Sequence, residues 1–566
     1  MTVAAAGRLV EFTDAGVFEA ADVHVARRLT ALAKESDESV ALAVAFAVRA
    51  LRGGSVCVDL RSVPAQVGLP ELPWPAPDAW LAAVRASPLV ADPPVLRLHC
   101  DAAADLLYLD RYWREEEQVR DDVLALLAPS ASTPLPDLTR LFPDSEEQRR
   151  AAHVALTQPL TVLTGGPGTG KTTTVARLLA LLAEQAALAG RPPLRIALAA
   201  PTGKAAARLL EAVLLEVCRL DPADRDRLPT LTASTLHRLL RSRPDNSSRF
   251  RHHRENRLPH DVIVVDETSM VSLTLMARLL EAVRPDSRLL LVGDPDQLAS
   301  VEAGAVLADL VDGLGARDDA RIATLVTSWR FGETIGGLAT AIRDGDADRV
   351  VEVLRAGGDH IAWLDTDEPG ERLRTVLLPQ ALRLREAAIL GNAAVALQTL
   401  DEHRLLCAHR RGPYGVQHWN RQVQRWLTDA TGEAIWTDWY AGRPVLVTAN
   451  DYGLGLYNGD TGVAIADSDG DGLSVAVGTQ TFAASRLSEV DTMYAMTIHK
   501  SQGSQAEEVT VLLPPEESRL LTRELFYTAV TRARQRVRVV GSERAVRAAI
   551  GRRVVRASGL RQRLQG

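Results

Sequence analysis

The chain has 566 residues, of which 46% are hydrophobic and 24% charged, and its formal net charge is −7. This length suggests about three or four domains, and the composition is ordinary for a globular protein with large apolar cores. The acidic balance neither supports nor excludes nucleic-acid binding, because a binder needs only a local lane of Lys and Arg along the phosphates.

The cysteine pattern indicates the redox state of the compartment in which the protein works. Four cysteines, Cys57, Cys100, Cys218 and Cys407, include no CxxC pair. This argues against a zinc ribbon, an iron–sulfur cluster or a disulfide framework, and it favours a reducing cytoplasm. The first residues lack a long apolar core and no run approaches membrane-spanning length, so we expect neither a signal peptide nor a membrane segment.

The first 125 residues are rich in Ala, Leu and Val at helical spacing, which predicts a small, mostly helical domain with a docking or structural role. A Pro- and Ser-rich linker, PSASTPLPDLTRLFPDS, follows it. From 126 to 340, apolar runs such as LTVLTG, RIALAAPT, DVIVVDE and RLLLVGD alternate with helical patterns. This alternation predicts an α/β domain with a parallel sheet, whose functional residues lie at the carboxyl ends of the strands.

Residues 341–566 predict a second α/β domain, interrupted at about 441–490 by short β-rich runs with Asn-Gly and Asp-Gly turns. We interpret that interruption as a small inserted β-barrel. The basic stretch 241–260 is expected to be a surface loop. The basic tail VVRASGLRQRLQG could touch DNA or a partner, although a solvated helix end is the favoured interpretation.

The strongest chemical signal is TVLTGGPGTGKTTTVARLLALL, an apolar run, a glycine-rich loop and a helical pattern. In that order, backbone amides of the loop point at phosphates and the helix offers its positive end. Lys171 reaches the outer phosphates and Thr172 is suited to hold Mg²⁺. A structural turn with a chance lysine is the weaker alternative. The residues expected to contact a nucleoside triphosphate are Gly165, Gly166, Pro167, Gly168, Thr169, Gly170, Lys171, Thr172 and Thr173.

Four further polar positions follow from strand ends or helix starts. Asp266, in VIVVDETSM, is placed to hold Mg²⁺ through its water shell, and the adjacent Glu267 to polarise the attacking water. Gln297 follows a third strand and suits a sensor of the γ-phosphate. Gln148, upstream, could read the adenine edge with its amide.

Two arginines complete the expected catalytic set. Arg330 in TSWRF and Arg532 in YTAVTRARQR lie in different parts of the chain and could neutralise charge on the γ-phosphate. If Arg532 belongs to the second α/β domain, hydrolysis requires the two domains to close. Surface salt bridges are the alternative role for these arginines.

These motifs occur in a fixed order between about 145 and 540: GGPGTGKTTT, AAPTGKAAARL, LTASTLHRLL, VIVVDETSM, LVGDPDQLASV, TSWRF, MYAMTIHKSQGSQ and ELFYTAVTRARQRV. The set resembles that of superfamily 1 helicases. The YNGDTG and LYLDRYW segments are most similar to the RecD family, the alpha subunits of exodeoxyribonuclease V. The string HKSQGSQ carries Gln505 where many relatives have Glu, which puts a charge-dependent role there in doubt.

The resemblance implies two RecA-like P-loop domains, a helical N-terminal domain and an SH3-like β-barrel insert. It also implies ATP and Mg²⁺ as cofactors, and assigns to ATP handling the positions Gln148, Lys171, Thr172, Asp266, Glu267, Gln297, Arg330 and Arg532. The positions implied to track single-stranded DNA are Pro201, Thr202, Lys204, Thr235, His237, Thr497, His499 and Lys500. The two histidines could instead be core or loop residues.

The function expected from this resemblance is an ATP-driven 5′→3′ motor on single-stranded DNA. It would unwind duplex ends as one subunit of a cytoplasmic helicase–nuclease, beside RecB-like and RecC-like partners. Three alternatives stay open: a free-standing RecD-like helicase, a largely non-catalytic assembly subunit, and a nuclease in its own right. The sequence shows no separate acidic cluster for a nuclease, whose site would then belong to a partner chain.

Overall fold

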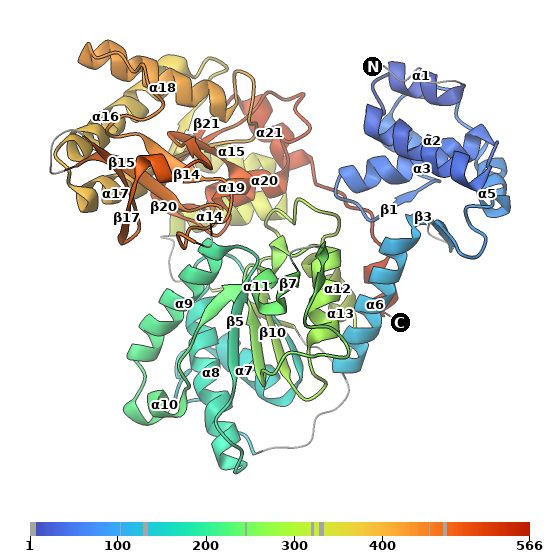
Figure 1. Cartoon of the computed structure of the whole chain (residues 1–566), viewed down its shortest axis with the longest axis horizontal. Helices are drawn as coiled ribbons and strands as arrows, with labels where there is room; N and C mark the ends of the chain where they lie inside the picture. The colour runs from blue at the N-terminus through green and yellow to red at the C-terminus, as the bar shows by residue number, and fades with distance from the viewer. Residues whose placement is uncertain are drawn as a thin grey trace.

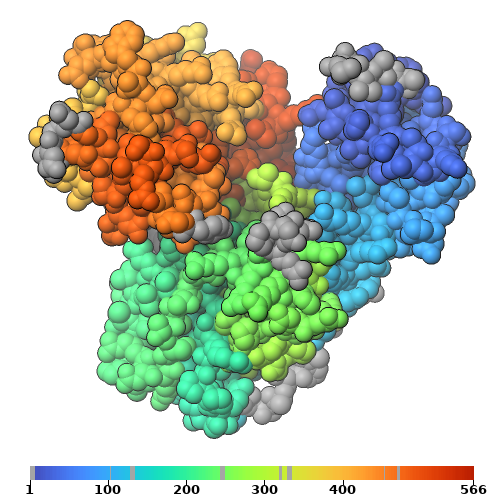
Figure 2. All heavy atoms as spheres, viewed as in Figure 1, coloured from blue at the N-terminus to red at the C-terminus, as the bar shows by residue number. Residues whose placement is uncertain are grey.

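A computed structural model describes residues 7–101, 104–127, 134–243, 246–317, 322–327, 333–451, 453–467 and 472–565. The chain forms three lobes (Figure 1). An N-terminal domain and a second α/β domain stand on opposite sides of a first α/β domain, and the space-filling view shows both resting on it (Figure 2). In the described part of the chain, no helix is both long and apolar enough to cross a membrane.

The N-terminal domain is helical, as predicted, and its core is aromatic. Phe12, Phe46 and Trp80 are buried, and the rings of Phe12 and Phe46 meet edge to face with centroids 5.8 Å apart. A small antiparallel sheet with the order β1-β3-β2 was not expected, because its short strands lie in Ala- and Leu-rich sequence. The elements are α1 (Arg8–Asp14), α2 (Ala20–Ala33), α3 (Glu38–Arg52), β1 (Cys57–Asp59), α4 (Val63–Val67), α5 (Pro77–Ala86), β2 (Leu96–Cys100), β3 (Asp105–Leu109) and α6 (Asp110–Leu126).

The first α/β domain is built on a six-stranded sheet with the order β11-β4-β10-β9-β5-β6, in which all neighbouring strands are parallel. Its strands are β4 (Leu160–Gly165), β5 (Ile196–Ala200), β6 (Ala233–Thr235), β9 (Val262–Val265), β10 (Arg288–Gly293) and β11 (Ile322–Leu325). Every residue of β4 is buried, as expected of a strand covered on both faces. The parallel sheet predicted from the alternating runs is confirmed.

Helices cover both faces of this sheet, and a hairpin projects from it. The helices are α7 (Glu146–Thr157), α8 (Lys171–Leu188), α9 (Gly203–Cys218), α10 (Pro222–Arg227), α11 (Leu236–Leu240), the 3-10 helix η1 (Thr268–Met270), α12 (Leu273–Ala282) and α13 (Val306–Gly315). The hairpin pairs β7 (Ser242–Arg243) with β8 (Asn246–Phe250). The stretch expected to be a loop therefore contains two short antiparallel strands.

The second α/β domain has a parallel sheet with the order β12-β21-β20-β13-β19. Its strands are β12 (Ile361–Leu364), β13 (His403–Cys407), β19 (Ala495–Thr497), β20 (Ala506–Leu512) and β21 (Ala533–Val540). Its helices are α14 (Glu333–Asp344), α15 (Ala347–Ala356), α16 (Gly370–Ile389), α17 (Ala393–Glu402), α18 (Val416–Thr431), α19 (Ile498–Ser501), α20 (Arg523–Val530) and α21 (Glu543–Gly551). This second parallel-sheet domain agrees with the prediction.

An antiparallel sheet with the order β17-β16-β15-β14-β18 is inserted between α18 and β19. Its elements are β14 (Pro444–Val447), β15 (Thr461–Ala466), β16 (Leu473–Val477), β17 (Gln480–Ala483), the 3-10 helix η2 (Ala484–Arg486) and β18 (Val490–Thr492). The insert is β-rich, as the turn signals predicted. The strand order is open from β17 to β18, so its SH3-like character stays a prediction.

The C-terminal tail returns from the second domain and ends beside α6 (Figure 1). Its last helix, α22 (Leu560–Gln565), packs on α13 and α6, with Leu560 and Leu564 fully buried. Upstream, the Ala557 carbonyl accepts a hydrogen bond from the Val56 amide at 3.0 Å. The interpretation as a solvated helix end is therefore wrong, because the apolar side chains of the tail complete a core formed by distant elements.

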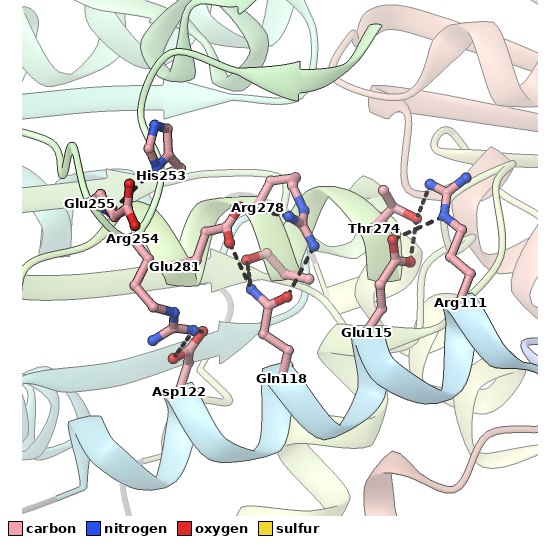
Figure 3. Close-up of polar contacts among 11 residues, drawn as sticks. Arg111, Glu115, Gln118, Asp122, His253, Arg254, Glu255, Thr274, Arg278 and Glu281 are labelled. Carbon is pink, nitrogen blue, oxygen red and sulfur yellow. Dashed lines mark hydrogen bonds and ion pairs between the residues drawn. The ribbon is translucent and has the colours of Figure 1, made fainter. Parts of the chain in front are cut away.

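Helix α6 also carries a row of polar side chains along α12 and the loop between β8 and β9 (Figure 3). The Gln118 amide donates to the Ala277 carbonyl at 2.9 Å and accepts from Arg278 at 3.0 Å. Glu115 accepts from the Thr274 hydroxyl at 2.7 Å. Further along the same face, Arg254 reaches both carboxylate oxygens of Asp122 at 2.8 Å. The N-terminal domain is thus attached to the first α/β domain by specific contacts along one whole helix.

Candidate nucleotide and nucleic-acid sites

The glycine-rich loop lies between the end of β4 and the start of α8. Gly168 and Gly170 have φ angles of 82° and 84°, a left-handed conformation that costs little only for glycine. Gly170 is the residue that immediately precedes α8. The Thr169 hydroxyl donates to the Gly166 carbonyl at 2.8 Å and closes the turn. The loop therefore has the backbone conformation that points amide groups at an anion before a helix start.

Lys171 is the first residue of α8, and its side chain folds back over the loop. Its ammonium group donates to the carbonyl oxygens of Gly165 at 2.6 Å and Gly166 at 2.9 Å. These two contacts hold a positive charge at the mouth of the turn, where the outer phosphates of a nucleotide would lie.

Asp266 and Glu267 follow the end of β9. The Asp266 amide donates to the Ala199 carbonyl of β5 at 2.9 Å, which fixes its place at the carboxyl edge of the sheet. Burial, together with the Glu267 carboxylate, raises the pKa of Asp266 to about 7, and Lys171 opposes both effects. Glu267 has a φ angle of 51°, which is unusual for a side chain of this kind and is typical of functional sites. A neighbouring cation would therefore strongly stabilise the charged form of the buried Asp266 carboxylate.

Gln297 lies in the segment that follows β10. Its side-chain nitrogen donates to Asp294 Oδ2 at 3.0 Å, while its buried Oε1 has no hydrogen-bond partner among the residues that the structure describes. The nitrogen of the Gln297 amide is thus held by Asp294, and its oxygen can accept a hydrogen bond from a ligand.

Residues of both α/β domains line one cavity of about 380 Å³. The first domain supplies the loop, Asp266, Glu267 and Gln297, and the second supplies Gln505 and Arg532. The structure therefore brings together the predicted catalytic residues Lys171, Asp266, Glu267, Gln297 and Arg532, as well as Thr172 and Thr173. Arg330 lies outside the described residues.

Gln148 lies in a neighbouring cavity of about 490 Å³ that shares Gly170 and Thr173 with the first. Its amide nitrogen donates to the Thr174 hydroxyl at 3.0 Å. The side wall of this cavity includes Phe142, over whose ring the Arg177 guanidinium lies at 5.8 Å. This cavity therefore combines apolar and polar side chains, as small-molecule sites generally do.

Arg532 enters the shared cavity from the start of β21. Its guanidinium donates to the Thr528 carbonyl at 3.0 Å and approaches the Ser504 carbonyl at 3.5 Å. Burial lowers its pKa, and the carboxylates of Glu267 and Asp294 oppose that effect. The charge is therefore held by neutral carbonyl oxygens inside a largely water-excluded site, where it can interact strongly with an anion.

The threonines predicted to contact DNA share one structural role. Thr202, Thr235 and Thr497 each precede a helix and accept, through the side-chain oxygen, a hydrogen bond of 3.2 Å from the amide of the third residue along. The helices that they cap begin at the carboxyl ends of β5, β6 and β19. Capping fixes the backbone amides of these helix starts at the sheet edges, where they can meet phosphates.

The two predicted lysines contact the β insert. Lys204 of α9 donates to the Gly459 carbonyl at 3.3 Å, and Lys500 of α19 donates to Asn458 Oδ1 at 2.6 Å. Burial lowers the pKa of Lys204 to about 8. One loop of the insert therefore contacts both α/β domains at positions expected to track a nucleic-acid strand.

The remaining predicted DNA positions differ in exposure. Pro201, directly after β5, and His499 are half-buried, whereas His237 is exposed. The His237 ring lies beside Phe250 of the hairpin, with centroids 5.8 Å apart. Burial and the nearby Arg556 lower the pKa of His499. His237 is therefore accessible at the surface, and His499 is partly packed.

Comparison with known proteins decides the family. The chain is 72% identical to the RecBCD enzyme subunit RecD of Mycolicibacterium smegmatis, over 97% of this chain and 98% of that protein. It is 68% identical to the subunit of the same name from Mycobacterium tuberculosis, over 100% of this chain and 98% of that protein. The chain belongs to the RecD family.

Matches to family models divide this RecD-family chain into parts. Residues 14–97 match the RecD N-terminal domain of the RecBCD enzyme, 148–303 an AAA domain, and 492–540 a UvrD-like helicase C-terminal domain. An ATP-dependent RecD2 DNA helicase of Deinococcus radiodurans is 34% identical over 74% of this chain and 52% of that protein. A Bacteroides Pif1 helicase structure aligns with 17% identity and a TM-score of 0.39, over 70% of this chain and 91% of that chain.

Arg208 is a cavity residue of this RecD-family chain that the sequence interpretation missed. It lies on α9, and its guanidinium donates to the Gly503 carbonyl of the second domain at 2.7 Å. Burial, together with the nearby Arg534 and Arg532, lowers its pKa to about 10. The signal was present in AAPTGKAAARL, because Arg208 lies four residues after Lys204 and so on the same face of the helix.

Proposed function

We propose that this RecD-family chain is an ATP-driven motor that moves 5′→3′ on single-stranded DNA and unwinds duplex ends. The observation that carries this proposal is the cavity that both α/β domains line, with Lys171 and Glu267 on one side and Arg532 on the other. Because the charge needed over the γ-phosphate comes from the second domain, ATP hydrolysis is coupled to closure of the two domains.

The residues present fit ATP with Mg²⁺. Thr172 and Asp266 line the same cavity and offer a hydroxyl and a carboxylate oxygen, the donors that Mg²⁺ prefers. Bound there, the ion would neutralise charge on the phosphates. Glu267 orients the attacking water, Lys171 and Arg532 stabilise the spreading negative charge, and Gln297 senses the γ-phosphate. The adjoining cavity with Gln148 receives the adenine base. Arg330 is proposed as a second cation on the γ-phosphate.

The strand path is proposed to cross the carboxyl edges of both sheets. The capped helix starts at Thr202, Thr235 and Thr497 offer backbone amides, and Pro201, Lys204, His237, His499 and Lys500 complete the set. These groups suit phosphate contact without sequence readout. As the two domains close and open, they hold the DNA strand with unequal strength, and this asymmetry moves the chain along the strand in one direction.

The biological setting follows from the relatives named as RecBCD subunits. We propose that the chain acts in the cytoplasm with RecB-like and RecC-like partners on double-strand ends, and that the nuclease site lies on a partner. The match of residues 14–97 to a RecD N-terminal domain supports this assignment over a free-standing helicase. We divide the chain into a docking domain (1–125), a first RecA-like domain (126–340) and a second RecA-like domain (341–566) whose insert, about 441–490, is an SH3-like barrel.

The motor can be tested with duplexes that carry only a 5′ or only a 3′ single-stranded tail. We expect ATP-dependent unwinding of the 5′-tailed duplex, and its complete loss in Lys171→Gln, because that variant lacks the charge at the outer phosphates. Strand separation is measured by fluorescence of a labelled strand. Preferential unwinding of the 3′-tailed duplex would overturn the direction, and full activity in Lys171→Gln would overturn the assignment of the ATP site.

A further inference from the structure

The segment of the first domain that carries Gln297 is held by side chains of the second domain. The Tyr527 hydroxyl donates to Asp294 Oδ2 at 3.0 Å. The Leu298 amide donates to the Thr528 hydroxyl at 2.9 Å, and the Leu298 carbonyl accepts from the Gln502 amide at 2.8 Å. The short stretch 294–298 is therefore bonded to the second domain at both of its ends.

Asp294 connects one of these contacts directly to Gln297. The same oxygen, Asp294 Oδ2, accepts from the Tyr527 hydroxyl and from the Gln297 side-chain nitrogen, each at 3.0 Å. The other oxygen, Oδ1, accepts from the Asp296 amide at 3.1 Å. With its nitrogen fixed in this way, the planar amide of Gln297 has its oxygen fixed as well, and Gln297 is part of the wall of the shared cavity. That oxygen is the buried atom without a partner among the described residues.

Tyr527 also touches the phosphate-binding loop. A side-chain carbon added at Gly166 would lie 3.1 Å from the Tyr527 hydroxyl oxygen, so the two groups are in near contact. Only 3% of Tyr527 is exposed, and burial raises its pKa well above the ordinary value. The hydroxyl therefore remains protonated and acts as a donor. Tyr527 lies on α20, five positions before Arg532, so one short stretch delivers both side chains to the first domain.

We propose that Tyr527 is a positioning residue which, through Asp294, aims the Gln297 amide into the ATP cavity only when the second domain is closed on the first. This inference rests on the proposed function and explains how domain closure fixes the orientation of Gln297 in the catalytic site. When the domains separate, Asp294 loses the Tyr527 donor and can rotate. Gln297 then loses its fixed orientation, so hydrolysis is suppressed in the open state.

The test compares Tyr527→Phe with the wild-type full-length chain in ATP hydrolysis stimulated by single-stranded DNA. Phenylalanine keeps the ring and removes only the hydroxyl group. We expect kcat to fall roughly tenfold, as for loss of one hydrogen bond to a charged group. The KM for ATP should stay within about twofold, because the orientation matters in the transition state rather than in binding. Asp294→Ala should reproduce the loss, because it removes the carboxylate that links the Tyr527 hydroxyl to the Gln297 amide.

A double variant separates positioning from packing. If Tyr527 acts through Gln297, Tyr527→Phe should cause no further loss of kcat in a Gln297→Ala background. The matched control is Tyr440→Phe. Its hydroxyl also makes buried hydrogen bonds, to Tyr494 and Gln424 at 3.2 Å, but it does not line the cavity. This control should keep the wild-type kcat.

The outcomes distinguish this inference from the proposed function. The positioning role would be overturned if Tyr527→Phe kept the wild-type kcat. It would also be overturned if Tyr527→Phe lowered kcat by the same factor in the wild-type and the Gln297→Ala backgrounds. If Tyr527→Phe has a lower melting temperature than Tyr440→Phe, Asp294→Ala is compared with and without Gln297→Ala instead, and equal fold-losses of kcat there would overturn the positioning role. A wild-type chain that does not hydrolyse ATP with single-stranded DNA would instead contradict the proposed function itself.

Discussion

The first α/β domain has two junctions with the rest of the chain, and they differ in chemistry. At its junction with the N-terminal domain and the tail, apolar side chains form one continuous core. Val119 and Val123 of α6, Leu560 and Leu564 of α22, and Leu310 of α13 are buried in the same cluster. Burial of such side chains stabilises by roughly 1.5–3 kcal/mol each, so this junction is expected to remain closed in the folded protein.

The junction with the second α/β domain is polar by comparison. In the described part of the chain, Leu298 is the one residue before α14 that joins the second domain's main core cluster. Hydrogen bonds supply the other contacts, such as Arg208 to the Gly503 carbonyl and Tyr527 to Asp294. Water can replace such bonds at a net difference of about 1 kcal/mol each. The apolar junction is therefore expected to stay closed, whereas the polar junction can open. The ATP cavity lies at the polar junction.

The largest expected effect is at the polar junction. Arg532→Ala should lower the kcat of DNA-stimulated ATP hydrolysis by about 10³-fold, because the second domain would no longer bring a cation to the γ-phosphate. Nucleotide binding, measured with a fluorescent ATP analogue, should persist because the loop of the first domain is unchanged.

Arg547→Ala is the matched control for Arg532→Ala. Arg547 is an arginine of the same domain, ion-paired with Asp348 at 2.7 Å on the surface of α21. Its replacement should leave kcat within about twofold, since exposed ion pairs contribute little. Equal effects of the two substitutions would show that the second domain contributes no specific charge to hydrolysis.

A smaller effect is expected at the apolar junction. Leu560→Ala removes a fully buried side chain of α22 and should lower the free energy of unfolding by about 2–5 kcal/mol. Leu32→Ala, whose leucine is 65% exposed, should change it by less than about 0.5 kcal/mol. Guanidinium denaturation followed by circular dichroism measures both. Equal stability of the two variants would mean that the tail does not hold this junction together.

The two junctions also separate what sequence could predict from what it could not. The loop at Gly165–Thr172 and the strand before it were predictable, because a local order of apolar run, glycines and helix specifies them. Burial of Leu560 and Leu564 was not, because their partners on α13 and α6 are hundreds of positions away in the chain. The contact that Arg208 makes with Gly503 was unpredictable for the same reason, since Gly503 lies in another domain, although the position of Arg208 on the same helix face as Lys204 was not.

The smallest expected effect is a pH dependence confined to the apolar junction. Burial, with a smaller contribution from the Glu116 carboxylate, raises the pKa of Asp309, on α13, to about 7. Between about pH 4 and pH 7, Asp309 therefore keeps a proton in the folded protein that it has lost in the unfolded chain. Its contribution to the free energy of unfolding falls as pH rises through that window.

Asp309→Asn should remove this group's part of the slope, reducing the stability difference between pH 5 and pH 8 by about 2–3 kcal/mol. Asp312→Asn is the matched control, because the Asp312 side chain on the same helix is 51% exposed and pairs with Arg561 at 3.2 Å. Guanidinium denaturation at the two pH values measures the difference. An unchanged slope in Asp309→Asn would contradict the raised pKa. If Asp309→Asn reduces the dependence of stability on pH but leaves kcat unchanged, protonation of Asp309 affects the apolar junction and not the ATP cavity. This result is expected if the two junctions act separately.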